Sequence, residues 1–400
     1  MNQNIEKLYK IASKSQRFII GLMSGTSMDG LDIALCKIQN AGTNTKVELV
    51  EFESVGFHTN FKEEVKKIFA KREIDFQHLC VLNPWIGIEH GKMILECLKK
   101  WKLTPNDIDL IASHGQTVFH APKRLHELEK FGNATLQIGD GDHLAVTTNI
   151  ITISDFRQKH IAAGGEGAPL AVYGDYLIFS TEDENRIMLN IGGIANFTYL
   201  PAHRDPKLVF STDVGTGNTL IDAFVQKHFP GKYFDENAEL ARKGMVNFAL
   251  LKELKSNDFF NQSFPKTTGP ELFGLNYLQT AQINSNTGSI SNEDVLATLT
   301  KFSADGITDA INKCFTKQEE LHVYLSGGGM HNPLMVEFIK QELPNCKFHT
   351  TDDLAIKPDA KEAVLFAILA NETVAGSGDA FGNKERGIPA VTMGKISFPN

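Results

Sequence analysis

The stretch RFIIGLMSGTSMDGLDIALCKI, residues 17–38, decides the fold class. An apolar run that starts at Phe18 leads into a turn of Gly, Ser, Thr and Asp residues, and a second apolar run ends at Ile38. Two short apolar runs joined by small polar residues are typical of a β-hairpin. The backbone amides and hydroxyls of such a turn can surround an anion. Taken alone, an ordinary tight turn explains the stretch better, and no Gly-Lys-Ser/Thr follows to make a Walker loop.

A second hairpin of the same kind occurs in RIMLNIGGIANFTYL, residues 186–200, with paired glycines at its turn. Helical patterns lie between the two hairpins; one has apolar residues at positions 61, 65, 68 and 69, which share a helical face. The alternation of strands and helices predicts an α/β fold. The repeated hairpin predicts two similar domains, residues 1–184 and 185–400, with a helix near 380–400 that packs back on the first.

Two glycine-rich segments follow strands in the second half. DVGTGN, residues 213–218, comes between a strand at 208–211 and a helix that begins near Thr219. The carboxylate of Asp213 is suited to take a proton from a hydroxyl, although an aspartate here could also cap a turn or the helix. SGGGMHNP, residues 326–333, offers bare backbone against which an adenine ring could lie. Close packing of a helix on a strand is the alternative explanation.

Polar side chains gather in SHGQTVFHAP, residues 113–122, and in DFRQKHIAAGGEGAPL, residues 155–170. Such loops suit a polyhydroxylated, acidic ligand. Arg157 could hold a carboxylate by two parallel hydrogen bonds, and Glu166 lies between glycines where its side chain could reach a ligand. Ordinary polar loops would explain each residue separately.

Composition excludes several classes of protein. The chain has 400 residues and a net charge of −8, which argues against a dedicated nucleic-acid binder. No apolar run approaches the roughly 20 residues that span a bilayer. Five cysteines without a CxxC pair, and no His, Cys and Asp at metal-ligand spacing, predict neither a disulfide framework nor a protein-bound metal. The expected setting is the reducing cytoplasm, without a membrane partner.

The motifs occur in a characteristic order: GLMSGTSMDGLD, SHGQT, LQIGD, DFR, GGEGAPL, LNIGGIAN, DVGTGN, SGGGMHNP and EAVLFAILA. From about Phe18 to the C-terminus the chain resembles the anhydro-N-acetylmuramic acid kinase family. The resemblance implies a two-domain actin/hexokinase-like (ribonuclease H-like) fold with the active site in the interdomain cleft. It implies that ATP, with Mg²⁺ bridging its phosphates, phosphorylates O6 of the sugar while water opens the 1,6-anhydro bond. A bacterial homodimer that salvages peptidoglycan fragments is also implied.

Roles for individual residues follow from the motifs and the resemblance together. Asp213 is the expected base that activates water. The residues expected to bind ATP are Gly25, Thr26, Ser27, Met28, Asp29, Gly30, Leu31, Asp32, Gly192, Gly193, Asn196, Gly215, Gly217, Asn218, Gly327, Gly328 and Gly329. The residues expected to bind the sugar are His114, Gln116, Arg157 and Glu166.

Several positions depart from the family pattern, mostly near the expected sugar site. Glu166 replaces a glutamine, His160 ends a stretch that is usually more basic, and Pro270 replaces an arginine. Residues 171–175 lack the usual proline and histidine, and Thr216 replaces a proline. Two alternatives therefore stay open: a kinase of the same fold for another acidic or amino sugar, and a non-catalytic nucleotide-binding protein of the actin-like fold.

Overall fold

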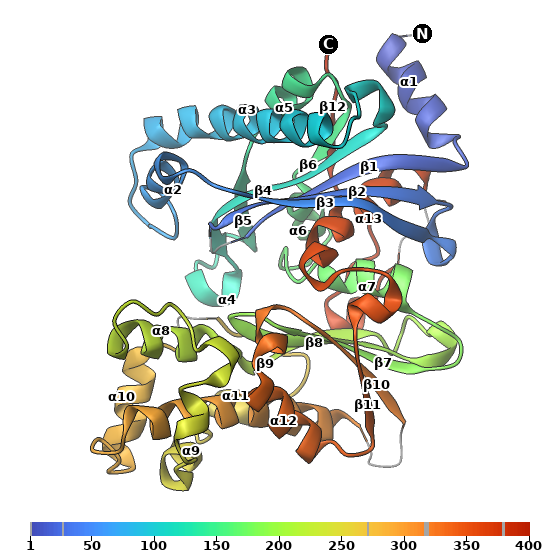
Figure 1. Cartoon of the computed structure of the whole chain (residues 1–400). Coiled ribbons are helices and arrows are strands. Elements are labelled where there is room, and N and C mark those ends of the chain that lie inside the picture. Colours follow the sequence, from blue (N-terminus) through green and yellow to red (C-terminus); the bar gives the residue numbers. More distant parts are fainter. Residues whose placement is uncertain (1, 26–27, 270–271, 316–319, 378–380) are drawn as a thin grey trace. The chain divides into compact units, whose positions relative to one another are not determined.

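The computed structural model describes residues 2–25, 28–269, 272–315, 320–377 and 381–400. The chain forms two compact units: unit 1 comprises Met1–Ser180 and Ala355–Asn400, and unit 2 comprises Thr181–Leu354 (Figure 1). The expected boundary after residue 184 lies four residues beyond the observed one. The expectation that the second domain runs to residue 400 is wrong, because the chain returns to unit 1 at residue 355.

Unit 1 is built on a mixed sheet. Its described strands are β1 (Gln16–Ser24), β2 (Gly30–Gln39), β3 (Lys46–Gly56), β4 (Leu110–Ala121), β5 (Ala134–Ile138), β6 (Thr152–Ser154) and β12 (Lys395–Ser397). The order is β12-β6-β4-β1-β2-β3, with β5 beside β4. β1, β2 and β3 form an antiparallel meander, whereas β4 is parallel to both β1 and β6. The predicted first hairpin is therefore β1–β2.

Helices cover both faces of this sheet, with α3 and α5 on one face and α13 on the other (Figure 1). The described helices are α1 (Gln3–Ala12), α2 (Thr59–Lys66), α3 (Phe76–Lys100), α4 (Lys123–His126), α5 (Gly141–Thr148), α6 (Phe156–Ala162), α7 (Ala171–Phe179) and α13 (Lys361–Ala375), with 3-10 turns at Gly42–Asn44, Pro105–Asp107, Pro358–Ala360 and Lys384–Arg386. Double coverage explains why β1 reads as an unbroken apolar run. α13 packs so closely that a Cβ at Gly21 would lie 1.9 Å from the Ala363 carbonyl oxygen.

Unit 2 repeats the same strand order. Its described strands are β7 (Asn185–Ile191), β8 (Ile194–Leu200), β9 (Phe210–Thr216), β10 (Leu321–Ser326) and β11 (Cys346–Thr350), in the order β11-β10-β7-β8-β9. β7, β8 and β9 are antiparallel, and β10 is parallel to both β7 and β11. This matches β6-β4-β1-β2-β3 of unit 1, which is the ribonuclease H-like arrangement. The predicted α/β class and the internal repeat are confirmed.

The helices of unit 2 pack against its sheet around one apolar core. They are α8 (Thr219–His228), α9 (Phe248–Leu254), α10 (Leu275–Asn284), α11 (Asn292–Cys314) and α12 (Pro333–Glu342), with 3-10 turns at Ala202–Arg204, Glu236–Ala238, Ala241–Lys243, Asp258–Asn261, Gly328–His331 and Thr351–Leu354. α11 packs against β9 and against α8, α9 and α12, and it is buried over most of its length (Figure 1).

Three local expectations need correction. The helix expected near 380–400 is absent from the described residues there, which hold a 3-10 turn and β12 instead. The helix predicted from position 61 ends at Lys66, although Phe61, Val65 and Ile68 are buried as the pattern requires. β9 continues to Thr216 instead of ending at residue 211, because it stays paired with β8 as far as Ile194.

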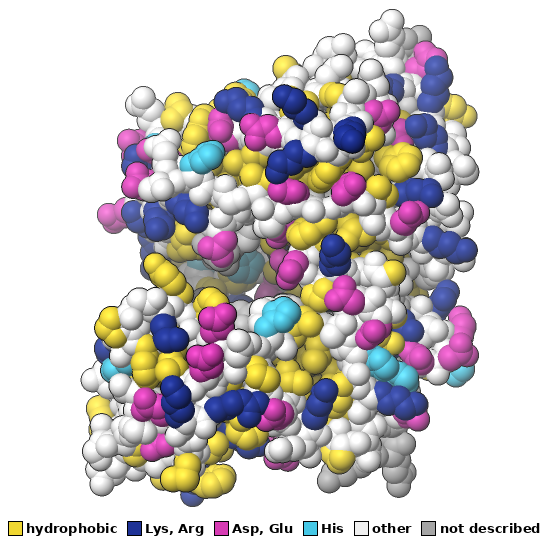
Figure 2. Space-filling model, viewed as in Figure 1, with side chains coloured by type: hydrophobic (Ala, Val, Ile, Leu, Met, Phe, Trp, Pro, Cys, Tyr) yellow, Lys and Arg dark blue, Asp and Glu magenta, His cyan; other side chains and the backbone are white. Residues whose placement is uncertain are grey.

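Charged side chains of both signs are interspersed over the face of the molecule that Figure 2 shows. Such mixing fits the modest net charge of −8 and gives no broad basic surface on that face. In the described part of the chain, no helix has both the length and the apolar character needed to cross a membrane.

Candidate active site

The first glycine-rich turn, between β1 and β2, is held by a buried glutamine. Gln116 is fully buried; its Oε1 accepts a hydrogen bond from the Ser24 hydroxyl, and its Nε2 donates to the Gly25 carbonyl oxygen at 3.2 Å. Gln116 was expected to bind the sugar, and the structure shows its amide engaged in fixing the turn. The next two residues of the turn, Thr26 and Ser27, lie outside the described residues.

The other predicted residues of this turn divide into core and surface positions. Met28 and Leu31 are buried in the core of unit 1. Gly30 is required by packing, because a Cβ there would lie 2.5 Å from a carbonyl oxygen of β3. Asp29 is exposed and Asp32 is half-buried, and burial is the main reason why the pKa of Asp32 is raised. Asp29 and Asp32 are therefore the side chains of this group that could meet a ligand.

The second turn, between β7 and β8, is joined to the start of α8 through the backbone. The Gly192 carbonyl oxygen accepts from the Asn218 amide at 2.9 Å, and the Gly193 carbonyl oxygen accepts from the amides of Gly217 and Thr219 at 2.8 and 3.1 Å. A Cβ at Gly217 would lie 2.3 Å from the Gly192 oxygen. Within the described residues, the amides of Gly192 and Gly193 donate no hydrogen bond, so they are available to an anion.

Asp213 lies on β9 and is hydrogen-bonded to the segment formed by residues 266–268. Its backbone amide donates to the Lys266 carbonyl oxygen at 2.9 Å, and its Oδ2 accepts from the Thr268 amide at 2.8 Å. Asn196 is its cross-strand neighbour on β8, and the following glycine, Gly215, packs against the α11 side of the sheet. The half-buried carboxylate is therefore held in one orientation by a backbone donor.

Sequence analysis missed the lysine that anchors this segment. Lys266 is only 7% exposed, and its Nζ donates to the Phe259 carbonyl oxygen at 2.8 Å. The Nζ also lies 4.1, 4.9 and 5.8 Å from the ring centroids of Phe259, Phe264 and Phe260. Burial lowers the pKa of Lys266 to about 8. The signal in the sequence was the phenylalanine-rich stretch before the lysine, whose rings surround the ammonium group.

The three glycines after β10 do not share one role. A Cβ at Gly327 would lie 2.8 Å from the Ile191 carbonyl oxygen, and a Cβ at Gly329 would lie 2.2 Å from the Ile191 side chain. Packing against β7 thus accounts for both. At Gly328 the nearest atom would be Asn218 Nδ2, at 3.8 Å. Gly328 is therefore the glycine of the three that leaves space for a ligand beside Asn218.

Among the expected sugar-binding residues, His114 and Arg157 form a pair. Arg157 Nε donates to His114 Nε2 at 2.8 Å, and its Nη1 donates to the Gly167 carbonyl oxygen at 2.7 Å. His114 is buried, and its Nδ1 lies 2.8 Å from the Gly115 carbonyl oxygen, to which it donates as the neutral tautomer. Burial and the Arg157 charge hold the pKa of His114 well below its usual value. Arg157 Nη2 makes no hydrogen bond within the described residues and can meet an acidic ligand.

Glu166 and His160, two departures from the family pattern, behave differently. Glu166 Oε2 lies 3.6 Å from Arg124 Nε, and both side chains are more than a third exposed. His160 is buried, and its Nδ1 accepts from the Gly167 amide at 3.0 Å. The ring also abuts Gly165, where a Cβ would lie 2.1 Å from it. His160 organises the glycine loop, whereas Glu166 stays accessible at its surface. Pro270 lies outside the described residues.

The two units share one strand order, and each has a glycine-rich hairpin turn. Unit 2 also holds a carboxylate fixed on β9, and the chain is of the actin/hexokinase-like class, as expected. The family profile described as anhydro-N-acetylmuramic acid kinase matches residues 16–396, and the chain belongs to this family. It is therefore a kinase that uses ATP.

Similar proteins cover the whole chain. It is 57% identical to "Anhydro-N-acetylmuramic acid kinase" of Pseudoalteromonas atlantica and 54% identical to that of Pseudoalteromonas translucida, in both cases over 100% of each chain. Among solved structures it is similar to component A of (R)-2-hydroxyglutaryl-CoA dehydratase from Acidaminococcus fermentans, with 12% identity, a TM-score of 0.43, and coverage of 90% of this chain and 99% of that chain.

Proposed function

We propose that this protein uses ATP and water to convert 1,6-anhydro-N-acetylmuramic acid into N-acetylmuramic acid 6-phosphate and ADP. Family membership over residues 16–396 supports the substrate. The observation that carries the chemistry is the carboxylate of Asp213, oriented by the Thr268 amide at 2.8 Å in the unit that holds the second glycine-rich turn. A non-catalytic nucleotide-binding protein would not require a carboxylate held in this way.

Asp213 acts as the general base in this proposal. It takes a proton from a water molecule, whose oxygen forms a bond to the anomeric carbon while the bond from that carbon to O6 breaks. O6 then forms a bond to the γ-phosphorus of ATP, and ADP leaves. A carboxylate fixed by one backbone donor keeps its orientation without a rearrangement during the reaction.

Backbone groups hold the nucleotide in this proposal. The amides of Gly192 and Gly193 face the phosphates, and the adenosine lies beside Gly328 and Asn218. Positioning and charge stabilisation supply most of the catalysis in phosphoryl transfer.

Mg²⁺ would be held mainly by phosphate oxygens and water, with few protein ligands. The described residues contain no group of three or more His, Cys, Asp or Glu side chains that could hold a metal, and the exposed carboxylate of Asp29 at the first turn is the protein group suited to contribute. The ion would offset the phosphate charge.

The Arg157 guanidinium binds the substrate carboxylate in this proposal. Burial lowers the pKa of Arg157 to about 10, so it stays charged at neutral pH, and neutral His114 fixes the guanidinium through Nε and leaves Nη2 for the ligand. Family membership also supports a bacterial cytoplasmic setting, a homodimer, and a role in peptidoglycan recycling without a nucleic-acid or membrane partner.

The test is to incubate the purified protein with Mg-ATP and 1,6-anhydro-N-acetylmuramic acid and to follow ADP release and the mass of the sugar product. The expected product has gained one phosphoryl group and one water. Asp213→Asn should lower kcat by about 100-fold or more, the usual contribution of a general base. Asp183→Asn, at an exposed position of unit 2, is the matched control.

Two results would overturn parts of the proposal. ATP consumption with another acidic or amino sugar, but not with this one, would reject the substrate and leave the fold and base. ATP binding without turnover of any sugar would favour the non-catalytic alternative.

A further inference from the structure

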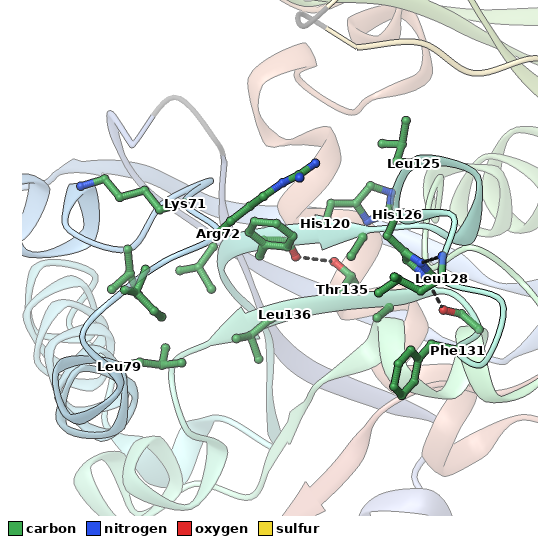
Figure 3. A pocket seen from close by; sticks show the side chains of 17 residues that line it. Lys71, Arg72, Leu79, His120, Leu125, His126, Leu128, Phe131, Thr135 and Leu136 are labelled. Carbon is green, nitrogen blue, oxygen red and sulfur yellow. Dashed lines mark hydrogen bonds between the residues drawn. The ribbon is translucent and has the colours of Figure 1, made fainter.

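A hollow of about 790 Å³ lies in unit 1 (Figure 3). None of the individual residues predicted to bind ATP or the sugar lines it, although part of its lining comes from residues 113–122. It is formed by the β4–β5 hairpin, by α4 and the loop after it, and by the connection between α2 and α3. Its volume is that of an ordinary small-molecule site, which typically measures about 300 to 1,000 Å³. The proposed reaction assigns no role to this hollow.

The lining is mostly apolar and much of it is exposed. Five large hydrophobic side chains of the lining are between 37 and 56% exposed: Ile74, Leu125, Leu128, Phe131 and Leu136. Single exposed hydrophobic residues on a surface need no explanation, but a contiguous group around a concavity indicates a binding site. Figure 3 shows Leu128, Phe131 and Leu136 around one cavity, from the α4 loop and β5.

Two of the polar side chains in the lining, Thr135 and His126, have partners within the protein. Thr135 Oγ1 donates to the Phe119 carbonyl oxygen at 3.2 Å (Figure 3). His126 Nε2 donates to the Gly132 carbonyl oxygen at 3.0 Å, while its Nδ1 accepts from the Leu128 amide at 2.9 Å. Because most of the lining is apolar, a sugar or nucleotide placed here would lose more hydrogen bonds to water than the lining could replace. The body of the ligand must therefore be apolar.

The charges of the lining have a single sign. Lys71 and Arg72 are exposed at the hollow, neither forms an ion pair within the described residues, and no lining residue is Asp or Glu. This is the reverse of the whole chain, whose net charge is −8. Two unpaired cations beside an apolar concavity are complementary to an anionic head group on an apolar body.

We propose that the hollow binds a small hydrocarbon carboxylate, whose apolar body lies on the leucine and phenylalanine side chains and whose carboxylate meets Arg72. The occupant is a free small molecule, because the concavity is of ligand size. The site is separate from the kinase reaction and does not depend on the proposed substrate.

Decanoate, below its micelle concentration, is the probe, and its displacement of the fluorescent anion 8-anilinonaphthalene-1-sulfonate measures binding to the full-length protein. We expect one dye bound per chain, displaced by decanoate but not by decanol. Leu136→Asp should weaken decanoate binding by at least about tenfold, equivalent to 1.4 kcal/mol. Val50→Asp is its matched control, because Val50 on β3 is 39% exposed and Leu136 on β5 is 40% exposed.

The head-group contact is tested by a second pair of variants. Arg72→Glu should weaken decanoate binding by about tenfold, whereas Lys46→Glu, an exposed lysine at the start of β3, should not. Circular dichroism establishes that each variant is folded. Equal binding by wild type and Leu136→Asp, equal displacement by decanol and decanoate, or equal losses in a variant and its control would each overturn the proposal.

Discussion

Replacing His160 by asparagine should make unit 1 less sensitive to acid. His160 is buried, its Nδ1 accepts from the Gly167 amide, and its ring packs edge-on against Tyr173. Protonation would place a second donor against that amide. Burial, aided by the Arg157 charge, lowers the pKa of His160 from 6.5 to about 4. Asparagine keeps an acceptor near the Nδ1 position and does not titrate.

The sign and size of the effect follow from linkage. Because the folded protein binds this proton more weakly than the unfolded chain, the stabilisation is present above pH 6.5 and is lost as the pH falls toward 4. Between about pH 7.5 and about pH 5, one such histidine removes about 2 kcal/mol of the free energy of unfolding. Burial lowers the pKa of His90 to about 4 and that of His114 well below 6.5, so both add losses of the same sign. The quantity to compare is therefore the difference between wild type and variant.

The two tryptophans of the chain, Trp85 and Trp101, both lie in unit 1, so urea unfolding followed by tryptophan fluorescence reports on that unit. From about pH 7.5 to about pH 5, wild type should lose about 2 kcal/mol more than His160→Asn. His58→Gln, at an exposed position of the same unit, should lose as much as wild type. Equal losses in wild type and His160→Asn, with both folded at the higher pH, would refute the reasoning.

Three further substitutions test the site. Gln116→Leu removes the amide that fixes the first turn, and in steady-state assays it should raise the KM for ATP by about tenfold, equivalent to one buried hydrogen bond. Gly217→Ala should destabilise unit 2 by about 1 to 3 kcal/mol in thermal unfolding, because its Cβ would lie 2.3 Å from the Gly192 oxygen; Gly288→Ala, with open space around it, is the control. Lys266→Met keeps the aliphatic body but loses the ammonium group that anchors the segment bonded to Asp213, the proposed general base, so kcat should fall by about tenfold at little change in KM. An unchanged KM, unfolding temperature or kcat, respectively, would contradict each expectation.

Local sequence patterns predicted the hairpins because each strand is a short apolar run that ends at a glycine-rich turn. They could not assign α13 to a unit. Its segment is almost entirely buried and apolar, and the sequence pattern of such a helix does not depend on which sheet the helix covers. Its partner is the backbone at Gly21 on β1, far away in the sequence, so only the folded chain shows the return to unit 1.

Within the site, residue types predicted chemistry but not partners. Asp213 could be selected because a carboxylate near a glycine-rich turn suits proton transfer. Its donor, the Thr268 amide, could not be selected, because a backbone group carries no signature in the sequence. Sequence analysis selected Gln116 as a site residue but did not predict its hydrogen bond to the first turn. A polar residue gives the same sequence pattern whether its side chain faces a ligand or a neighbouring turn.

The departures from the family pattern do not all bear on substrate choice. His160 is explained by packing, since its ring fills the space beside Gly165 and its Nδ1 accepts from the loop that follows. Asp175 is 3% exposed and forms a 2.9 Å ion pair with Lys361, so it too is tied to the interior of unit 1. Glu166 has no such structural role: its carboxylate is partly exposed beside an arginine, on the loop whose backbone accepts a hydrogen bond from Arg157. Because a ligand can reach Glu166 and cannot reach His160 or Asp175, Glu166 is the one of these three departures that we propose for a role in substrate choice.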